Sequence, residues 1–426
     1  MKLAKWFLVA TAFALYLPSI SLRAAESPAV STRFDLPATD DGLPGSGPVR
    51  RYDWFKKLWS ERRAGWATRV KQDQNAVVFL GDSITQGWGD VGSSFPGLKT
   101  ANRGISGDTT RGVLIRLEED VLSLNPRGIV LLIGTNDLEE QAEPEVIAAN
   151  VKLILAALRQ HNAKMPVVLC RVMPSSAEKK RPADKIKRLN QLLGEVVATE
   201  PQVTVLDTWA LFANELGDAP RAEFPDLLHP NSLGYGRWAK ALRPILETLA
   251  LLPSWPDDDF VPEPGFEPLF NGRDFTGWSY PEGQSLDGKT VTPDGRFQAV
   301  NGRLVVTVSR AVGDYKKLWT TRKFPRDFTL KLEFRASPNA DSGIYIREPQ
   351  LQCRDYLLAG PYTALNSYRP LEWNEIIVTV KGGLAHATCN GEVLVDAFVV
   401  PPTGAIGVES DRGQMEYRRI RIKETP

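Results

Sequence analysis

Four short segments of the chain place Ser, Gly, Asn, Asp or His beside apolar runs or helical patterns. Ser83 lies in GDSIT after AVVFL, Gly104 lies in ANRG, Asn136 lies in GTND after GIVLLI, and Asp226 and His229 lie in DLLH. A serine hydroxyl is a weak nucleophile until a neighbouring base takes its proton, and histidine is the usual base. These residue types therefore indicate ester hydrolysis through an acyl-serine.

The base is expected to be His229. Of the three histidines in the chain, His161 ends a helical pattern and His386 lies among short C-terminal strands. Only His229 follows a carboxylate, Asp226, by three residues in a turn. Such a carboxylate can bond one ring nitrogen, fix the tautomer and stabilise the imidazolium that forms. The sequence thus predicts Ser83, His229 and Asp226 as the catalytic group.

The negative charge that develops on the attacked carbonyl oxygen needs hydrogen-bond donors. The backbone N–H groups of Ser83 and Gly104 and the side-chain amide of Asn136 are the expected donors of this oxyanion hole. Each such donor can contribute about 3 to 4 kcal/mol in a dry site. Glycine at position 104 lets the backbone approach the substrate, because no Cβ stands in the way.

Each of these residues also has a purely structural interpretation. Ser83 can simply cap a turn after a strand, and Asn136 can be a turn residue. The segment Asp226–His229 can cap the last helix, but Asn231 or Ser232 can serve as that cap. This second option leaves Asp226 and His229 free for chemistry.

Three further polar residues near these segments are expected to be structural. Asp82 should bond backbone amides in the turn that contains Ser83. Thr109 should be the N-cap of the helix that follows it, and Asp137 should cap the helix or turn that follows it. No zinc or calcium pattern accompanies them in the sequence. The predicted reaction therefore needs no metal and no cofactor.

The elements that must position these residues alternate in type. Helical patterns begin near Trp54, Thr109, Pro144, Asp184 and Ser232. Short apolar runs separate most of them: VVFLG (77–81), GIVLLIG (128–134), PVVLCRV (166–172) and QVTVLD (202–207). Such a pattern predicts an α/β fold with a parallel sheet covered by helices on both faces. Ligands bind at the carboxyl ends of such strands, where the polar segments lie.

The composition and the N-terminus set the context for these elements. The chain has 426 residues, 42% hydrophobic and 24% charged, with a net charge of +1. This length predicts two domains, and the balanced charge gives no reason to expect nucleic acid as a partner. Residues 1–25 are typical of a signal peptide, so we expect an exported protein without a membrane span in the mature chain. A retained N-terminal anchor is the alternative.

A second region of different character follows the α/β pattern. We expect a flexible lead-in at 26–50, the first domain at 51–252, a Pro-rich acidic linker at 253–265, and a second domain at 266–426. The second domain has short alternating strands with Asn-Gly turns, which predict an antiparallel β-sandwich. Cys170 is expected to be buried, whereas Cys353 and Cys389 can pair after export.

The first domain resembles the SGNH (GDSL-type) hydrolase family over roughly residues 75–250. GDSIT, NRG, GTND and DLLH match the four family blocks in order, and NRGISGDTTRGVLIRL is similar to the acetylhydrolase branch. The resemblance implies a flavodoxin-like three-layer fold and an esterase acting on short acyl groups. It also implies the same roles for the Ser, Gly, Asn, Asp and His residues named above.

The second domain resembles the 3-keto-disaccharide hydrolase domain family, which has a concanavalin-like sandwich. FEPLFNGRDFTGW, SGIYIR, LEWNEIIVTVKGG and GAIGVES carry the resemblance. The chain departs from the family at Gln350-Leu351-Gln352 and at Gly407–Asp411, which lacks a histidine. These departures favour carbohydrate binding over glycosidic cleavage, with Asp355, Glu409 and Asp411 as the remaining acidic candidates.

Together these features predict a secreted serine esterase that removes acetyl groups from carbohydrate, with the sandwich binding glycan. Three alternatives stay open. The protein can be a lipid or short-acyl esterase with the sandwich as a spacer, a non-catalytic glycan-binding protein, or a protein whose second domain is also a glycosidase. The sequence does not define the sugar, the linkage or the oligomeric state.

Overall fold

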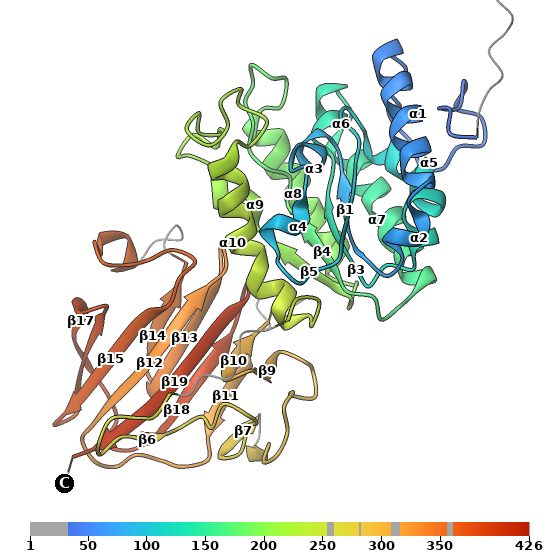
Figure 1. The fold of residues 1–426 in the computed structure, drawn as a ribbon. Helices are drawn as coiled ribbons and strands as arrows, with labels where there is room; N and C mark the ends of the chain where they lie inside the picture. The colour runs from blue at the N-terminus through green and yellow to red at the C-terminus, as the bar shows by residue number, and fades with distance from the viewer. Residues whose placement is uncertain (1–32, 254–259, 281–282, 308–315, 356–360, 426) are drawn as a thin grey trace, which may run out of the picture.

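The computed structural model describes residues 33–253, 260–280, 283–307, 316–355 and 361–425. The predicted signal peptide lies outside these residues, as does much of the predicted linker. Figure 1 shows an N-terminal α/β part and a C-terminal part built of strands. Among the described helices, none has the length and apolar character needed to cross a membrane.

Five parallel strands form the sheet of the α/β part, in the order β2-β1-β3-β4-β5. The strands are β1 (Val77–Gly81), β2 (Thr100–Gly104), β3 (Gly128–Leu132), β4 (Val167–Cys170) and β5 (Val203–Leu206). Four of them fall within predicted runs. The sequence missed β2, because TANRG lacks the continuous apolar character of a buried strand and lies at the sheet edge.

Helices cover both faces of this sheet, which confirms the predicted α/β class (Figure 1). The helices are α1 (Asp53–Ala67), α2 (Val70–Asp73), α3 (Ser83–Gly87), α4 (Val91–Ser94), α5 (Thr110–Asp120), α6 (Thr135–Glu139), α7 (Pro144–His161), α8 (Ala183–Val197), α9 (Thr208–Phe212) and α10 (Ser232–Thr248). Val78 and Leu80 of β1 pack in the core with α5, α7 and α8, whereas Val77 and Phe79 pack in the core with α10. Both faces of the strand are therefore buried, as its apolar run predicts.

The segment at 33–50 contacts the α/β part at several points. The Arg111 side chain of α5 donates to the carbonyls of Pro44 and Gly47, and the Asn150 amide of α7 donates to the carbonyl of Ser46. Arg50 forms ion pairs with Glu139 and Glu140 at the end of α6. The described part of the predicted lead-in is therefore held against α5, α6 and α7 by hydrogen bonds and ion pairs.

The C-terminal part is an antiparallel β-sandwich, as predicted. One sheet has the order β17-β16-β15-β12-β19-β10-β9 with β6 on β19, and the other has the order β14-β13-β18-β11-β7-β8. The strands are β6 (Glu267–Pro268), β7 (Trp278–Tyr280), β8 (Gln284–Ser285), β9 (Phe297–Val300), β10 (Arg303–Val306), β11 (Lys316–Thr320), β12 (Phe328–Ala336), β13 (Asp341–Arg347), β14 (Gln350–Arg354), β15 (Asn374–Lys381), β16 (Leu384–Cys389), β17 (Glu392–Val399), β18 (Ala405–Ser410) and β19 (Met415–Glu424). Cys353 and Cys389 are buried free thiols, so the structure does not contain the disulfide that the sequence allowed.

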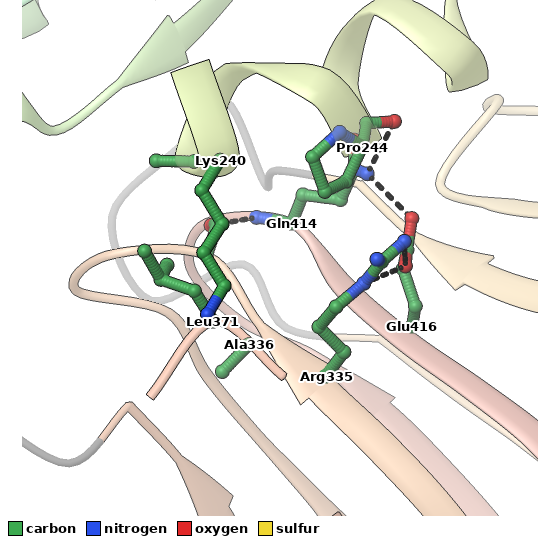
Figure 2. Close-up of a pocket in the computed structure, with 9 residues that line it drawn as sticks. Lys240, Pro244, Arg335, Ala336, Leu371, Gln414 and Glu416 are labelled. Carbon is green, nitrogen blue, oxygen red and sulfur yellow. Dashed lines mark hydrogen bonds and ion pairs between the residues drawn. The ribbon is translucent and has the colours of Figure 1, made fainter. Parts of the chain in front are cut away.

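The two parts meet along the second half of α10. Figure 2 shows the contact, in which the Gln414 amide donates to the carbonyl of Pro244 and to the carboxylate of Glu416. Arg303 of β10 donates to Glu247 of α10 at 3.1 Å and to Glu416 of β19 at 2.9 Å. All three of these charged side chains are at least nine-tenths buried. A buried ion cluster therefore joins the sandwich to the helix that follows the predicted catalytic histidine.

Candidate functional site

Ser83 begins α3 directly after β1. The Asp82 carboxylate accepts a hydrogen bond from the N–H of Ile84 at 2.9 Å, and Asp82 is the N-cap of α3. This contact confirms the expected structural role of Asp82. Gly81 makes the turn possible, because a Cβ there would lie 2.3 Å from the carbonyl oxygen of Leu132. The strand therefore delivers Ser83 at the carboxyl edge of the sheet.

His229 and Asp226 lie in the loop before α10, whose N-cap is Asn231. The Asp226 carboxylate accepts from the backbone N–H of His229 at 2.7 Å and from that of Leu228 at 3.0 Å. Its second oxygen lies 2.7 Å from Nδ1 of His229. The capping role that competed with chemistry is thus filled by Asn231, and Asp226 is free to hold the histidine.

The structure brings Ser83, His229 and Asp226 into one hydrogen-bonded chain. Nε2 of His229 lies 2.9 Å from Oγ of Ser83. Because a carboxylate only accepts, Nδ1 carries the proton toward Asp226, and in the neutral ring Nε2 is left as an acceptor facing the serine hydroxyl. This is the geometry that removal of the Ser83 proton requires.

The electrostatics of Asp226 fit the same arrangement. Partial burial acts to raise the pKa of Asp226, but the hydrogen bonds from the backbone N–H and the ring of His229 outweigh it and bring the pKa to about 2. Asp226 is therefore ionised at neutral pH. A charged carboxylate at Nδ1 stabilises the imidazolium that would form when His229 takes a proton.

The expected oxyanion donors lie at the same edge of the sheet. Gly81 of β1 is paired in register with Gly104 of β2 and with Leu132 of β3, so the residues that follow these strands converge. The N–H of Gly104 donates to Oδ1 of Asn102 at 3.0 Å. The sequence did not reveal this contact, which a substrate would have to share or replace. A Cβ on Gly104 would lie 2.3 Å from the backbone nitrogen of Gln86.

Asn136 lies in the first turn of α6, and its side chain is buried. Its Nδ2 donates to the carbonyl of Asp108 at 2.8 Å, and its Oδ1 accepts from Nη2 of Arg181 at 3.1 Å. The Asn136 amide nitrogen carries two N–H groups. Among the described residues, the only hydrogen bond that Nδ2 donates is the one to the carbonyl of Asp108. The other N–H can therefore serve a ligand.

Three buried aspartates lie beneath this edge. Burial raises the pKa of Asp82 to about 6, that of Asp108 to about 6 and that of Asp137 to about 7. Asp108 pairs with the buried Arg116 at 2.8 Å. Asp137 lies inside α6, and its carboxylate accepts from the N–H and hydroxyl of Thr110, the first residue of α5, so the expectation that it caps the helix or turn that follows it is wrong. Thr109 is the N-cap of α5, as predicted.

The acidic candidates of the sandwich do not form a comparable catalytic arrangement. The Glu409 carboxylate accepts from the hydroxyl of Tyr345 at 2.9 Å and is also bonded by the Gln350 amide. Asp355 accepts from the N–H of Asn339 at 3.0 Å. Burial raises the pKa of both Glu409 and Asp411. Among the contacts of these acidic side chains in the described residues, none joins a carboxylate to a histidine or to a serine positioned as a nucleophile.

Arg181, Asn102 and Asp108 are residues of the site that the sequence analysis missed. Asn102 lies two positions before Gly104 and accepts from its N–H, whereas Asp108 and Arg181 contact Asn136 from segments that are distant in sequence. Asn102 and Asp108 do lie within NRG and GDTT, whereas Arg181 lies in a connection without a recognisable pattern. Only the fold brings Asp108 and Arg181 to Asn136.

Both the α/β part and the β-sandwich part of the chain match known protein families. Residues 79–237 match the model of the GDSL-like lipase/acylhydrolase family, and residues 265–423 match that of the 3-keto-alpha-glucoside-1,2-lyase-like domain. Platelet-activating factor acetylhydrolase IB subunit alpha1 from Bos taurus is 28% identical over 213 residues, which cover 48% of this chain and 90% of that protein.

Two solved structures are each similar to less than half of the chain. A GDSL-like lipase from Bacteroides thetaiotaomicron has a TM-score of 0.39 and 24% identity, and the match covers 45% of this chain and 97% of that one. A candidate glycosyl hydrolase from Parabacteroides distasonis has a TM-score of 0.32 and 19% identity, with 40% and 100% covered.

Proposed function

We propose that this protein is a carboxylic ester hydrolase that removes short acyl groups, above all acetyl, from carbohydrate. The match of residues 79–237 to the GDSL-like lipase/acylhydrolase family supports the ester substrate, and the match of residues 265–423 to the 3-keto-alpha-glucoside-1,2-lyase-like domain supports the carbohydrate. The contact of Ser83 with His229, itself held by Asp226, is the observation that carries the proposal. It supplies a nucleophile, a base and an orienting carboxylate in one place.

The proposed reaction has two halves. Ser83 Oγ attacks the ester carbonyl carbon while its proton passes to Nε2 of His229. The tetrahedral intermediate collapses, the C–O bond to the alcohol breaks, and His229 returns the proton to the leaving alcohol. Water then attacks the acyl-serine, again giving its proton to His229, and the acid leaves as Ser83 regains its hydrogen. Asp226 holds the imidazolium in each half.

Donors around the carbonyl oxygen lower both barriers. The backbone N–H of Ser83, the N–H of Gly104 and the second N–H of Asn136 are the proposed donors. Their contribution is greatest where negative charge develops on this oxygen, in the transition states that lead to and from the tetrahedral intermediate. Because Gly104 already bonds Asn102, this donor is expected to contribute less than the others unless that bond shifts on substrate binding.

Three observations favour acetylated carbohydrate as the substrate. The similar curated proteins are named acetylhydrolases, and the second domain matches a family named for a glucoside. In addition, Tyr52 and Trp54 are each 52% exposed with ring planes 10° apart. Parallel exposed rings can stack on a sugar ring, and Trp54 lies against Gly107, three residues after Gly104. We propose export as the setting, on the basis of residues 1–25.

The competing functions make different predictions. An esterase that uses the sandwich as a spacer would hydrolyse simple esters as well as glycan esters. A glycan-binding protein without catalysis would release no acetate. The hydrogen bonds that join Ser83, His229 and Asp226 argue against this alternative. Glycosidase activity in the sandwich has the least support, because Glu409 is engaged by Tyr345 and Gln350.

Acetate release distinguishes these functions. Acetylated xylan, acetylated pectin and p-nitrophenyl acetate are compared with the wild-type protein and with Ser83→Ala. We expect turnover in the wild type, preference for an acetylated glycan, and loss of turnover in the variant. Equal efficiency on all three substrates would favour the spacer alternative. Absence of acetate from every substrate would exclude the deacetylase proposal.

A further inference from the structure

We propose that Arg181 is a positioning residue that fixes the Asn136 amide with one N–H directed to the substrate oxyanion. This inference rests on the proposed function, since it assumes that Asn136 is an oxyanion donor. Arg181 comes from the connection between β4 and α8, far from Asn136 in sequence, and is 2% exposed. Its side chain is therefore built into the site.

The orientation of the Asn136 amide is determined from both ends. Nη2 of Arg181 lies 3.1 Å from Oδ1, and the carbonyl oxygen of Asp108 lies 2.8 Å from Nδ2. A guanidinium only donates and a carbonyl only accepts. A flipped amide would place N–H groups against Arg181 and an oxygen against the Asp108 carbonyl, so both bonds would be lost. Arg181 thus selects the orientation that presents Nδ2.

The charge of Arg181 gives it a second effect on the amide. A cation at Oδ1 draws electron density from the amide nitrogen, and polarised hydrogen-bond chains strengthen one another. The remaining N–H of Asn136 becomes a stronger donor to a negatively charged oxygen. This effect is larger for the oxyanion than for a neutral ester carbonyl, so it acts mainly on kcat.

The other bonds of Arg181 hold the guanidinium in place. Nε donates to the carbonyl of Thr135 at 3.0 Å, Nη1 donates to that of Lys179 at 2.6 Å, and Nη2 also pairs with Glu139 at 2.7 Å. Glu139 is shared with Arg50 from the N-terminal segment. Since α6 supplies the Thr135, Asn136 and Glu139 contacts, Arg181 is fixed to the same helix whose amide it orients.

A double-mutant cycle tests the inference with p-nitrophenyl acetate. Arg181→Met should lower kcat roughly 10- to 100-fold with KM nearly unchanged, the range expected for a weakened oxyanion donor. Arg181→Lys should recover part of kcat, because an ammonium can still donate to Oδ1. In an Asn136→Ala background, where no amide remains to be oriented, Arg181→Met should lower kcat no further.

A matched control separates this role from simple stabilisation. Arg171 lies in the same connection between β4 and α8, but it pairs with Asp207 and not with Asn136. In Arg171→Met, kcat should therefore stay at the wild-type level. If Arg181→Met does not fold, the same cycle is run with Arg181→Lys. Equal kcat losses in the wild-type and Asn136→Ala backgrounds, or no loss at all, would overturn the inference.

The outcome also separates this inference from the proposed function. Activity that survives in Ser83→Ala would defeat the proposed function itself. Loss of activity in Ser83→Ala, together with wild-type kcat in Arg181→Met, would defeat the role of Arg181 and leave the function intact.

Discussion

The proposed chemistry depends on a few hydrogen bonds between single residues. His229 is the centre, with Ser83 on Nε2 at 2.9 Å and Asp226 on Nδ1 at 2.7 Å. All three residues were predicted from the sequence. Ser83 was predicted from its place in GDSIT after an apolar run, and His229 and Asp226 because DLLH is the one segment that pairs a histidine with a nearby carboxylate. Their contacts could not be predicted from spacing, since 146 positions separate Ser83 from His229.

Replacement of the orienting carboxylate should affect catalysis more than folding. In Asp226→Asn, the amide can keep the backbone bonds but no longer stabilises an imidazolium, so we expect kcat to fall about 10²- to 10⁴-fold. Steady-state kinetics with p-nitrophenyl acetate measures this change. Unchanged kcat in a folded variant would show that His229 acts without Asp226.

Asp82 provides a test of stability against pH. Burial raises its pKa to about 6 in the folded protein, from 3.8 for the free group. A carboxyl with a raised pKa contributes stability below pH 3.8, and that contribution is lost as the pH rises through 6. At 1.36 kcal/mol per pKa unit, the wild type should lose up to about 3 kcal/mol from this group between about pH 4 and pH 7.

Asp82→Asn removes that dependence, because an amide does not titrate. The free energy of unfolding of the variant, relative to the wild type, should therefore rise between about pH 4 and pH 7. Urea unfolding of both proteins at the two pH values gives the difference. A difference that stays constant would mean that Asp82 titrates normally in the folded state.

At the scale of elements, the sheet was easier to predict than the turns. Continuous apolar residues identified β1, β3 and β4, which are buried throughout, since strands buried on both faces leave that pattern. The run QVTVLD also identified β5, although most of its residues are only half-buried. The edge strand β2 was missed because TANRG is largely polar. The short helices α3 and α6 were missed because five residues are too few to show helical periodicity.

The close packing of β2 against α3 predicts a sensitive glycine. In Gly104→Ala the added Cβ would lie 2.3 Å from the nitrogen of Gln86 and 2.7 Å from the carbonyl oxygen of Asp82. Both atoms belong to the backbone that holds Ser83, so the nucleophile must move. We expect kcat to fall roughly 100-fold or more, because misplaced reacting groups lose that much.

Gly65→Ala in α1 is the matched control, because a Cβ there has no neighbour within 4 Å. It should leave kcat unchanged and stabilise the helix by about 0.5 to 1 kcal/mol. Kinetics and thermal unfolding of both variants make the comparison. Wild-type kcat in Gly104→Ala would mean that this backbone is not part of the site.

At the scale of the whole molecule, the sandwich is joined to α10 by the buried cluster of Arg303, Glu247 and Glu416. Both sequence regions were predicted, and so were their fold classes. The contact between the two regions was not predicted, because its residues are far apart in the chain and no sequence pattern distinguishes them from exposed charged residues. Leu371 of the sandwich part also packs in the hydrophobic cluster that contains α10 residues.

Arg303→Met tests the energetic weight of this contact. The substitution leaves the carboxylates of Glu247 and Glu416 buried without the positive charge of Arg303. Removing one partner of a buried ion pair typically costs about 3 to 5 kcal/mol, so we expect the free energy of unfolding to fall by about that amount. Lys240→Met is the control, because its pair with Glu372 is nearly half exposed and should contribute only about 0 to 1 kcal/mol. Unfolding free energies that fall equally in both variants would contradict a buried interface.

The central claim is that Ser83 is the nucleophile, and covalent labelling tests it most directly. The wild-type protein is treated with diisopropyl fluorophosphate, and the adduct is located by peptide mass spectrometry, with Ser83→Ala as the control. We predict one adduct on Ser83, loss of esterase activity in step with labelling, and no adduct in the variant. Activity without labelling of Ser83, or retained turnover in Ser83→Ala, would contradict the account.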